Sequence, residues 1–96
     1  MYYLIAYDIS NDKTRRLAVK LCKKAGLTRV QRSLFMGAAP VPKIQDIRNE
    51  LSPLLDPKTD SLTIQPLDKA AYQRLSFTGK KWSKKDIARE HDIIFI

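Results

Sequence analysis

The stretch Tyr3-Leu4-Ile5-Ala6-Tyr7-Asp8 decides the fold of this chain. It contains β-forming residues without Gly or Pro and is followed by turn-forming residues, so we predict a strand over residues 2–8. Because side chains of a strand point alternately to its two faces, the faces carry Tyr3, Ile5 and Tyr7, and Leu4 and Ala6. Both faces are apolar, which is typical of a strand covered on both sides. The strand nevertheless ends in a carboxylate.

Two segments have the hydrophobic spacing of amphipathic helices. The first covers residues 12–25, with Ser10 or Asn11 as the expected N-cap and Gly26 as the expected stop. The opposite side of this segment carries Lys and Arg side chains. Residues 40–54 predict a second helix, in which a Pro is suited to the first turn.

Two further strands are predicted. Residues 28–36 alternate with the period of a strand, although Arg32 interrupts the apolar row. Gly37-Ala38-Ala39 is either a tight hairpin into a very short strand or a bend that prolongs this one, and the sequence does not decide between them. Residues 61–67 predict the other strand. Residues 69–75 could form a single helical turn.

This order of elements predicts an α+β fold. We expect a ferredoxin-like βαββαβ sandwich, in which two helices cover one face of an antiparallel sheet, as a single domain over residues 1–96. Two helices leave one apolar face of the first strand open, so we predict a homodimer that stacks the open sheet faces of two copies. Residues 80–96 are expected to form a basic linker and an extra C-terminal strand, 92–96, that contacts the partner protomer.

The composition is that of a soluble globular protein with a strong positive charge. The formal net charge of +8 favours a polyanionic partner, nucleic acid first and an anionic membrane surface second; the alternative is a generic solubilising surface. No apolar run could span a membrane and no secretory signal is evident, so we expect a cytoplasmic protein. One Cys and one His exclude an intrachain disulfide and a Cys/His zinc site. Cys22 is expected in the core and His91 on the surface.

Asp8 has two interpretations. It could start the loop as a carboxylate bonded to nearby backbone. It could instead bind a hard cation such as Mg²⁺, which takes oxygen ligands and keeps several waters. One carboxylate per chain makes a poor site, whereas two related by a dimer axis make an adequate one. The metal hypothesis therefore depends on the predicted dimer.

Basic side chains are predicted near Asp8, and Arg is suited to bidentate capture of phosphate. The candidates for binding nucleic acid are Lys13, Arg15, Arg16, Lys20, Arg29 and Arg32. Each has the alternative of a solvated surface charge. Tyr7 and Phe35 could stack on bases or pack at the dimer seam, and packing is favoured. A second basic group around Trp82 is either a phosphate contact or a solvated linker.

Several segments together resemble the CRISPR-associated protein 2 family. They are Tyr7-Asp8-Ile9, Asp12-Lys13-Thr14-Arg15-Arg16, Gly26 to Gly37 (GLTRVQRSLFMG), and Asp60-Ser61-Leu62 with Gln65-Pro66-Leu67. They span residues 2–67 in the expected order. The stretch after Gly37 departs from the usual form, and the C-terminal third matches only loosely.

The resemblance implies a symmetric dimer with a Mg²⁺ or Mn²⁺ ion between two copies of Asp8. It also implies a role in acquiring CRISPR spacers, in which the dimer binds double-stranded DNA and bridges copies of the integrase subunit. Members have been assigned metal-dependent endonuclease activity on single-stranded RNA or double-stranded DNA. Carried over from the family, the catalytic residues are Asp8, Tyr7, Arg15 or Arg16, Arg29 and Phe35.

Two functional hypotheses follow. The first is a dimeric metal-dependent phosphodiesterase, in which paired Asp8 side chains hold the cation and Arg side chains neutralise phosphate. The second is a non-catalytic DNA-binding adaptor that recruits the integrase, and both can be true. A third class, an RNA-recognition module with the same fold, is disfavoured because the aromatic signature that stacks bases on the sheet is missing.

Overall fold

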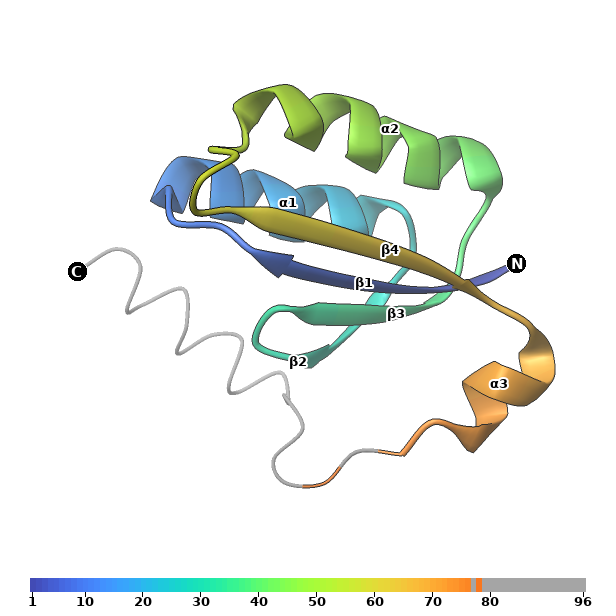
Figure 1. Cartoon of the computed structure of the whole chain (residues 1–96). Helices are drawn as coiled ribbons and strands as arrows, with labels where there is room; N and C mark the ends of the chain where they lie inside the picture. Colours follow the sequence, from blue (N-terminus) through green and yellow to red (C-terminus); the bar gives the residue numbers. More distant parts are fainter. Residues whose placement is uncertain (77, 79–96) are drawn as a thin grey trace.

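The computed structural model describes residues 1–76 and 78, in which strands and helices are joined by short connections (Figure 1). The elements are β1 (Tyr2–Asp8), α1 (Asp12–Lys24), β2 (Thr28–Gln31), β3 (Leu34–Ala38), α2 (Val41–Leu51), a 3-10 turn η1 (Ser52–Leu54), β4 (Ser61–Leu67) and α3 (Lys69–Arg74). The strands predicted at 2–8 and 61–67 and both amphipathic helices are confirmed. The predicted strand at 92–96 lies outside the described residues.

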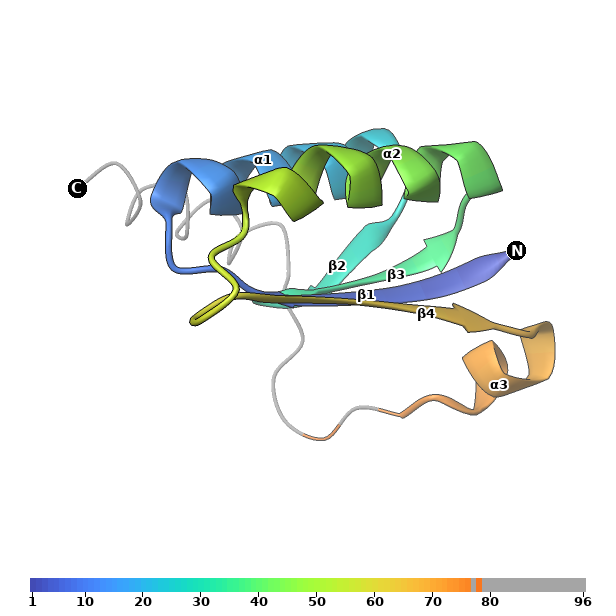
Figure 2. The ribbon, with the colours of Figure 1, turned by 45° about the horizontal axis from the view of Figure 1, so that its top comes forward.

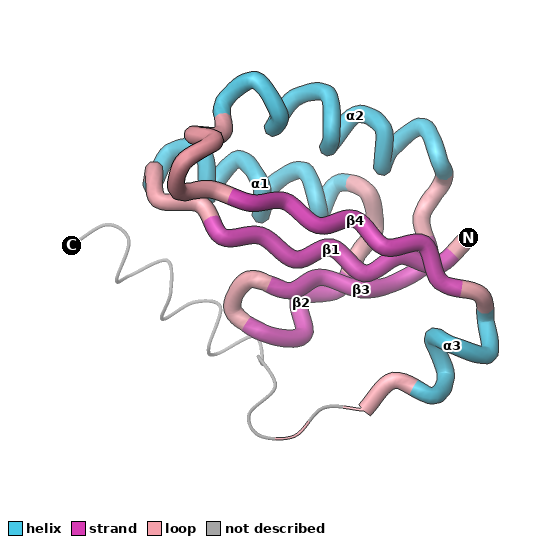
Figure 3. Tube along the Cα trace, in the orientation of Figure 1, coloured by secondary structure: helices cyan, strands magenta, loops and turns pink. Residues whose placement is uncertain are grey.

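The four strands form one antiparallel sheet in the order β2-β3-β1-β4, so β1 pairs on both sides (Figure 3). Helices α1 and α2 lie side by side over one face of this sheet, and α3 lies beyond the other face (Figure 2). The predicted α+β sandwich, with βαββαβ order and both long helices on one face, is confirmed. The strand that ends in Asp8 is therefore central.

The core lies between the sheet and the two long helices. On this side of β1 and β3 the buried side chains are Tyr3, Ile5, Tyr7 and Phe35. The helices contribute Ala18, Val19, Cys22, Ile44, Ile47 and Leu51. Because strand side chains alternate, Leu4, Ala6 and Asp8 point to the opposite face, where Leu4 and Ala6 are half-buried and Asp8 is exposed.

The two ends of α1 are fixed by local signals. Asn11, rather than Ser10, is the N-cap, because its Oδ1 accepts a hydrogen bond from the backbone N–H of Thr14 at 3.0 Å. The helix ends at Lys24, and Gly26 then adopts a φ of +93°, a conformation that favours glycine. The cap lies three residues after Asp8 and fixes the start of α1 at Asp12.

The strand predicted over residues 28–36 is wrong, because these residues form a hairpin. β2 ends at Gln31, Arg32 and Ser33 make the turn, and β3 begins at Leu34. The turn therefore precedes Gly37, where the sequence suggested a hairpin. Arg32, which interrupts the apolar row, was the local sign of this turn.

A bulge explains why the hairpin looks like one strand in sequence. Arg29 pairs with Phe35 and Thr28 pairs with Met36, while the register shifts between Arg29 and Gln31. Because of the extra residue, the partners in the pairs Arg29–Phe35 and Thr28–Met36 are an even number of positions apart in the sequence. The alternation of polar and apolar residues therefore continues through the turn. Alternation alone could not separate one strand from two.

Helix α3 confirms the single helical turn considered at residues 69–75. Asp68 caps it by accepting a hydrogen bond from the N–H of Ala71 at 2.7 Å. The Tyr72 ring stacks on Tyr2 with ring centroids 4.4 Å apart, so α3 lies against the start of β1, at the opposite end from Asp8. In the described part of the chain, no helix has the length and apolar character needed to cross a membrane.

Candidate functional site

Asp8 ends β1 with an exposed carboxylate on the face opposite the two long helices. Its partner in the β1–β4 register is Ser61. Within residues 1–76 and 78, no hydrogen bond or ion pair holds the Asp8 side chain. The interpretation of Asp8 as a carboxylate bonded to the loop backbone thus has no supporting contact in the described chain. The carboxylate is available to bind something else.

Tyr7, Phe35 and Arg29 form a buried group on the helix-covered face. The rings of Tyr7 and Phe35 are stacked with centroids 6.4 Å apart, and the Arg29 guanidinium lies 5.6 Å from the centre of the Phe35 ring. Tyr7 is 5% exposed, Phe35 0% and Arg29 4%. Both aromatic residues therefore pack in the core of their own chain, and not on bases or at the seam of a dimer through the open face.

Arg29 supports the hairpin from inside. Its Nε donates a hydrogen bond to the carbonyl oxygen of Arg32 at 3.0 Å, and its Nη2 donates to the same oxygen. The carbonyl of Ser33 in turn accepts a hydrogen bond from the N–H of Tyr7 at 3.1 Å, so the hairpin tip lies beside the end of β1. Arg32 is the exposed arginine that this tip presents to solvent.

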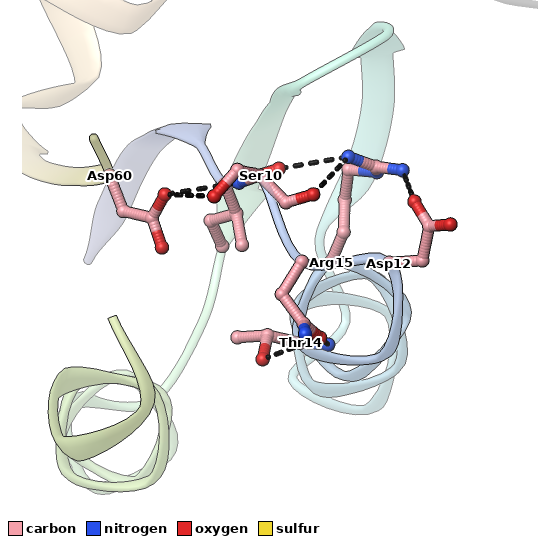
Figure 4. Close-up of polar contacts among 7 residues, drawn as sticks. Ser10, Asp12, Thr14, Arg15 and Asp60 are labelled. Atoms are coloured by element: carbon pink, nitrogen blue, oxygen red, sulfur yellow. Dashed lines mark hydrogen bonds and ion pairs between the residues drawn. The ribbon is translucent and has the colours of Figure 1, made fainter. Parts of the chain in front are cut away.

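Arg15 is turned toward the loop between β1 and α1 (Figure 4). Its Nη1 donates to the carbonyl oxygen of Ile9 at 2.9 Å and to that of Ser10 at 3.5 Å, and its Nη2 forms an ion pair with Asp12. Arg15 therefore links the first turn of α1 to the two residues that follow Asp8.

Other basic side chains of α1 lie on its exposed surface. Residues three and four positions apart share one face of a helix, and the exposed basic positions with this spacing are Lys13, Arg16 and Lys20. These three, with Arg32 on the hairpin tip, are the predicted nucleic-acid contacts that the fold leaves on the surface. Arg29 and Arg15 are instead engaged with backbone carbonyls.

Asp60 is a second carboxylate at this end of the sheet, and no sequence pattern connected it to Asp8. It accepts hydrogen bonds from Ser10 N at 3.0 Å, Ser10 Oγ at 2.9 Å, Asp56 N at 3.0 Å and Thr59 Oγ1 at 3.0 Å. The N–H groups of Asp56 and Ser10 are the main causes that lower the pKa of Asp60 from 3.8 to about 2. Turn residues before the last strand were the available signal, but Ser10 is 50 positions away.

Among residues 1–76 and 78, Asp8 does not form a complete cation site with other side chains of its own chain. No group of three or more His, Cys, Asp or Glu side chains that could hold a metal occurs within the described residues. Asp60 has its oxygens occupied by hydrogen bonds, and burial raises the pKa of the Cys22 thiol to about 12, so Cys22 stays protonated. The exposed carboxylate of Asp8 fits a hard cation as one half of a shared site.

Comparison with known proteins identifies the family. Residues 1–75 match the family model described as CRISPR associated protein Cas2. The chain belongs to the Cas2 family. A CRISPR-associated endoribonuclease Cas2 of Chloroflexus aurantiacus is 35% identical over 79 residues, which cover 82% of this chain and 84% of that protein. The crystal structure of Streptococcus pyogenes Cas2 at pH 6.5 superposes with a TM-score of 0.68 and 32% identity, over 82% of this chain and 100% of that one.

One Cas2 relative is joined to a second protein. A Thermoproteus tenax protein named a CRISPR-associated endonuclease Cas1/endonuclease Cas2 fusion is 26% identical over 69 residues, which cover 72% of this chain and 26% of that protein. The Cas2 family match over residues 1–75 includes Asp8, the Tyr7–Phe35–Arg29 group and Asp60. The whole candidate site therefore lies inside the region shared with the family.

Proposed function

We propose that this Cas2 chain acts as a homodimer that hydrolyses phosphodiester bonds of nucleic acid, with Mg²⁺ or Mn²⁺ held between two copies of Asp8. One observation carries the proposal. The Asp8 carboxylate is exposed, has no partner within residues 1–76 and 78, and shares a strand face with the half-buried apolar residues Leu4 and Ala6. A carboxylate free to bind a cation is thus next to a surface suited to a second copy of the chain.

The open face of the sheet supports the dimer. Ala6 of β1 pairs with the half-buried Leu34 of β3, so half-buried apolar side chains on this face extend over two strands, while Met36, the partner of Leu4, is 3% exposed. A two-fold axis through this face would bring the same residues of both copies together and relate their Asp8 side chains. A monomer mass at micromolar concentration in sedimentation equilibrium contradicts this part of the proposal.

A cation at the exposed Asp8 carboxylate suits hydrolysis of a phosphodiester. Water adds across the P–O bond, and negative charge on the phosphate must be stabilised while that bond breaks. A bound divalent cation supplies positive charge to this phosphate. Asp8 would hold the cation, while Arg16 and Arg32, exposed on α1 and on the hairpin tip, would neutralise other phosphates of the bound nucleic acid. Arg15 and Arg29 act from inside by holding the loop and the hairpin.

Single-stranded RNA is the substrate class that we favour, and double-stranded DNA is the alternative. The Chloroflexus relative carries the name endoribonuclease, and it covers most of this chain. Contacts to phosphate carry no sequence information, so we expect cleavage with weak sequence preference.

Asp8→Asn tests the proposal because it removes the charge of the carboxylate and keeps its size. We expect Mg²⁺-dependent cleavage of single-stranded RNA to fall by about 100-fold or more, with unchanged thermal stability. Asp68→Asn is the matched control, since Asp68 is an exposed Asp at the other end of β4 and should leave cleavage unchanged. Undiminished cleavage by rigorously purified Asp8→Asn protein rules out the Asp8 mechanism.

A second role, as a DNA-binding adaptor that bridges the CRISPR integrase subunit, is supported by charge. The formal net charge is +8, and Lys13, Arg16 and Lys20 are exposed along one side of α1. The Thermoproteus fusion, which joins a Cas2 relative to Cas1 in one chain, makes Cas1 the candidate partner.

Charge reversal on α1 tests the adaptor role. The pair Lys13→Glu and Lys20→Glu should weaken binding of double-stranded DNA and lower the dependence of log K on log salt by about one unit for each lost phosphate contact. Asp8→Asn should keep the affinity and salt dependence of the unmodified chain. If the charge reversals leave the salt dependence unchanged, the outer face of α1 does not bind DNA.

A further inference from the structure

Asp60 is the residue near the candidate site whose role the proposed function does not explain. It directly precedes β4, which begins at Ser61, and it joins two separate segments of the chain. One oxygen, Oδ1, accepts from both the N–H and the hydroxyl of Ser10, while Oδ2 accepts from the N–H of Asp56. A single carboxylate thus ties the loop after β1 to the turn before β4.

The loop that Asp60 holds begins directly after Asp8. Ile9 and Ser10 connect Asp8 to the N-cap of α1, and Arg15 binds the carbonyl oxygens of the same two residues (Figure 4). The N–H and hydroxyl of Ser10 therefore donate to Asp60, while the carbonyl oxygens of Ile9 and Ser10 accept from Arg15. The backbone that follows Asp8 is fixed by hydrogen bonds to Asp60, in the turn before β4, and to Arg15 of α1.

We propose that Asp60 is a positioning residue for the Asp8 cation site, and that it acts by fixing the Ile9–Ser10 backbone so that Asp8 leaves β1 in one direction. This inference rests on the proposed function. Both oxygens of Asp60 accept hydrogen bonds from its own chain, Oδ1 from Ser10 and Oδ2 from Asp56, so the role that we propose for Asp60 is support and not ligation.

A shared site makes such support necessary. Each chain brings one carboxylate, and no cluster of further metal-binding side chains exists in the described residues to orient the cation. The orientation of the Asp8 side chain then depends on its backbone. A small displacement of this backbone would affect both copies of Asp8 in the dimer. Sites of this kind lose affinity when the supporting shell is loosened, even if the ligands are intact.

The test measures Mn²⁺ affinity of the full-length chain by the electron paramagnetic resonance signal of free Mn²⁺, with folding of each variant verified by circular dichroism. Asp60→Ala should weaken Mn²⁺ binding by about tenfold while the protein remains folded. Asp68→Ala is the matched control: it also removes an Asp that accepts a backbone hydrogen bond, but at the other end of β4, and should change affinity by less than about twofold. Wild-type affinity in folded Asp60→Ala protein overturns the inference.

Asp60→Asn separates positioning from stability. The amide oxygen can still accept from Ser10, but the amide nitrogen replaces the acceptor of the Asp56 N–H, so stability should fall while Mn²⁺ affinity stays near that of the wild type. Should Asp60→Ala fail to fold, Ser10→Ala takes its place, because it removes the hydroxyl donor and leaves the turn before β4 intact. We expect weaker binding by about threefold, and unchanged binding overturns the inference.

Asp8→Asn distinguishes this inference from the proposed function. If Asp8→Asn abolishes Mn²⁺ binding and Asp60→Ala leaves it unchanged, the proposed site stands and the role of Asp60 is wrong. If Asp8→Asn binds Mn²⁺ like the wild type, or if the wild type binds none, the cation site itself is wrong and the inference is overturned with it.

Discussion

The two faces of β1 are both apolar in sequence, yet the chain covers them very differently. Tyr3, Ile5 and Tyr7 are at most 5% exposed under the long helices. Leu4 and Ala6, on the other face, remain half-buried. The helix α3 reaches only the start of this face, where Tyr72 stacks on Tyr2. The comparison teaches that a pattern of residues can indicate burial on both sides of a strand, while the two long helices among the described residues cover only one side.

The same contrast extends to the carboxylates at the end of the β1–β4 pair. Asp60 is bound by four donors of its own chain. Asp8, on the open face, has no partner within residues 1–76 and 78. Asp60 therefore has a structural role in the described chain, whereas Asp8 is the residue of the proposed cation site. Substitutions on the two faces should therefore differ in kind as well as in size.

Ile5→Ala should give the largest effect on the covered face. Ile5 is 0% exposed, and its removal leaves a cavity between sheet and helices. We expect the free energy of unfolding to fall by about 2–5 kcal/mol, measured by urea denaturation. The loss should be the same at every protein concentration, because these contacts lie within one chain.

Leu4→Ala is the neighbouring control on the open face. Its effect on the urea midpoint should be largest at high protein concentration and shrink as the protein is diluted through the dimer dissociation range, since only the dimer gains stability from this contact. If Leu4→Ala behaves like Ile5→Ala at all concentrations, the two faces do not differ in the way proposed.

Ala6→Glu should dissociate the dimer while the chain stays folded. A two-fold axis would place the new carboxylates of both copies in one apolar interface, and we expect the dissociation constant to rise by about 100-fold or more. Sedimentation velocity measures the change in mass. Gln45→Glu adds the same charge on the exposed side of α2 and should leave the mass unchanged. A stable Ala6→Glu dimer would place the interface elsewhere.

The sequence was sufficient to predict the fold where hydrophobic period and end signals agree. The apolar stretch before Asp8 and the helix between Asn11 and Gly26 are of this kind. The hairpin at Arg32–Ser33 could not be located, because the bulge before Gln31 preserves the alternation of polarity through the turn. Turn position depends there on pairing between strands, which the alternation does not encode.

The candidate site was only partly predictable. Asp8 could be chosen as a candidate from the sequence because a carboxylate at the end of an apolar strand is unusual. Asp60 is connected to the loop after Asp8 by its hydrogen bonds to Ser10, which lies 50 positions earlier in the chain. Only the pairing of β1 with β4 brings these two residues together. We expected Arg29 to contact phosphate, because charged side chains favour the surface. Its guanidinium is instead buried against Phe35 and donates a hydrogen bond to the carbonyl oxygen of Arg32. Side-chain direction near a bulge is set by tertiary packing.

Acid titration gives the smallest expected effect and compares the two carboxylates directly. The N–H groups of Asp56 and Ser10 lower the pKa of Asp60 to about 2 from 3.8. A carboxyl whose pKa is lower in the folded state stabilises the fold above its unfolded pKa and loses this contribution as the pH falls toward the folded pKa. The difference in urea midpoint between wild type and Asp60→Asn should therefore be constant above about pH 5 and shrink between about pH 4 and pH 2.

Asp8→Asn, which removes a carboxylate that has no partner in the described chain, should leave the midpoint unchanged when measured on the monomeric Ala6→Glu background. If the difference in urea midpoint between wild type and Asp60→Asn persists at pH 2, protonation of Asp60 is not what lowers the stability of the fold in acid.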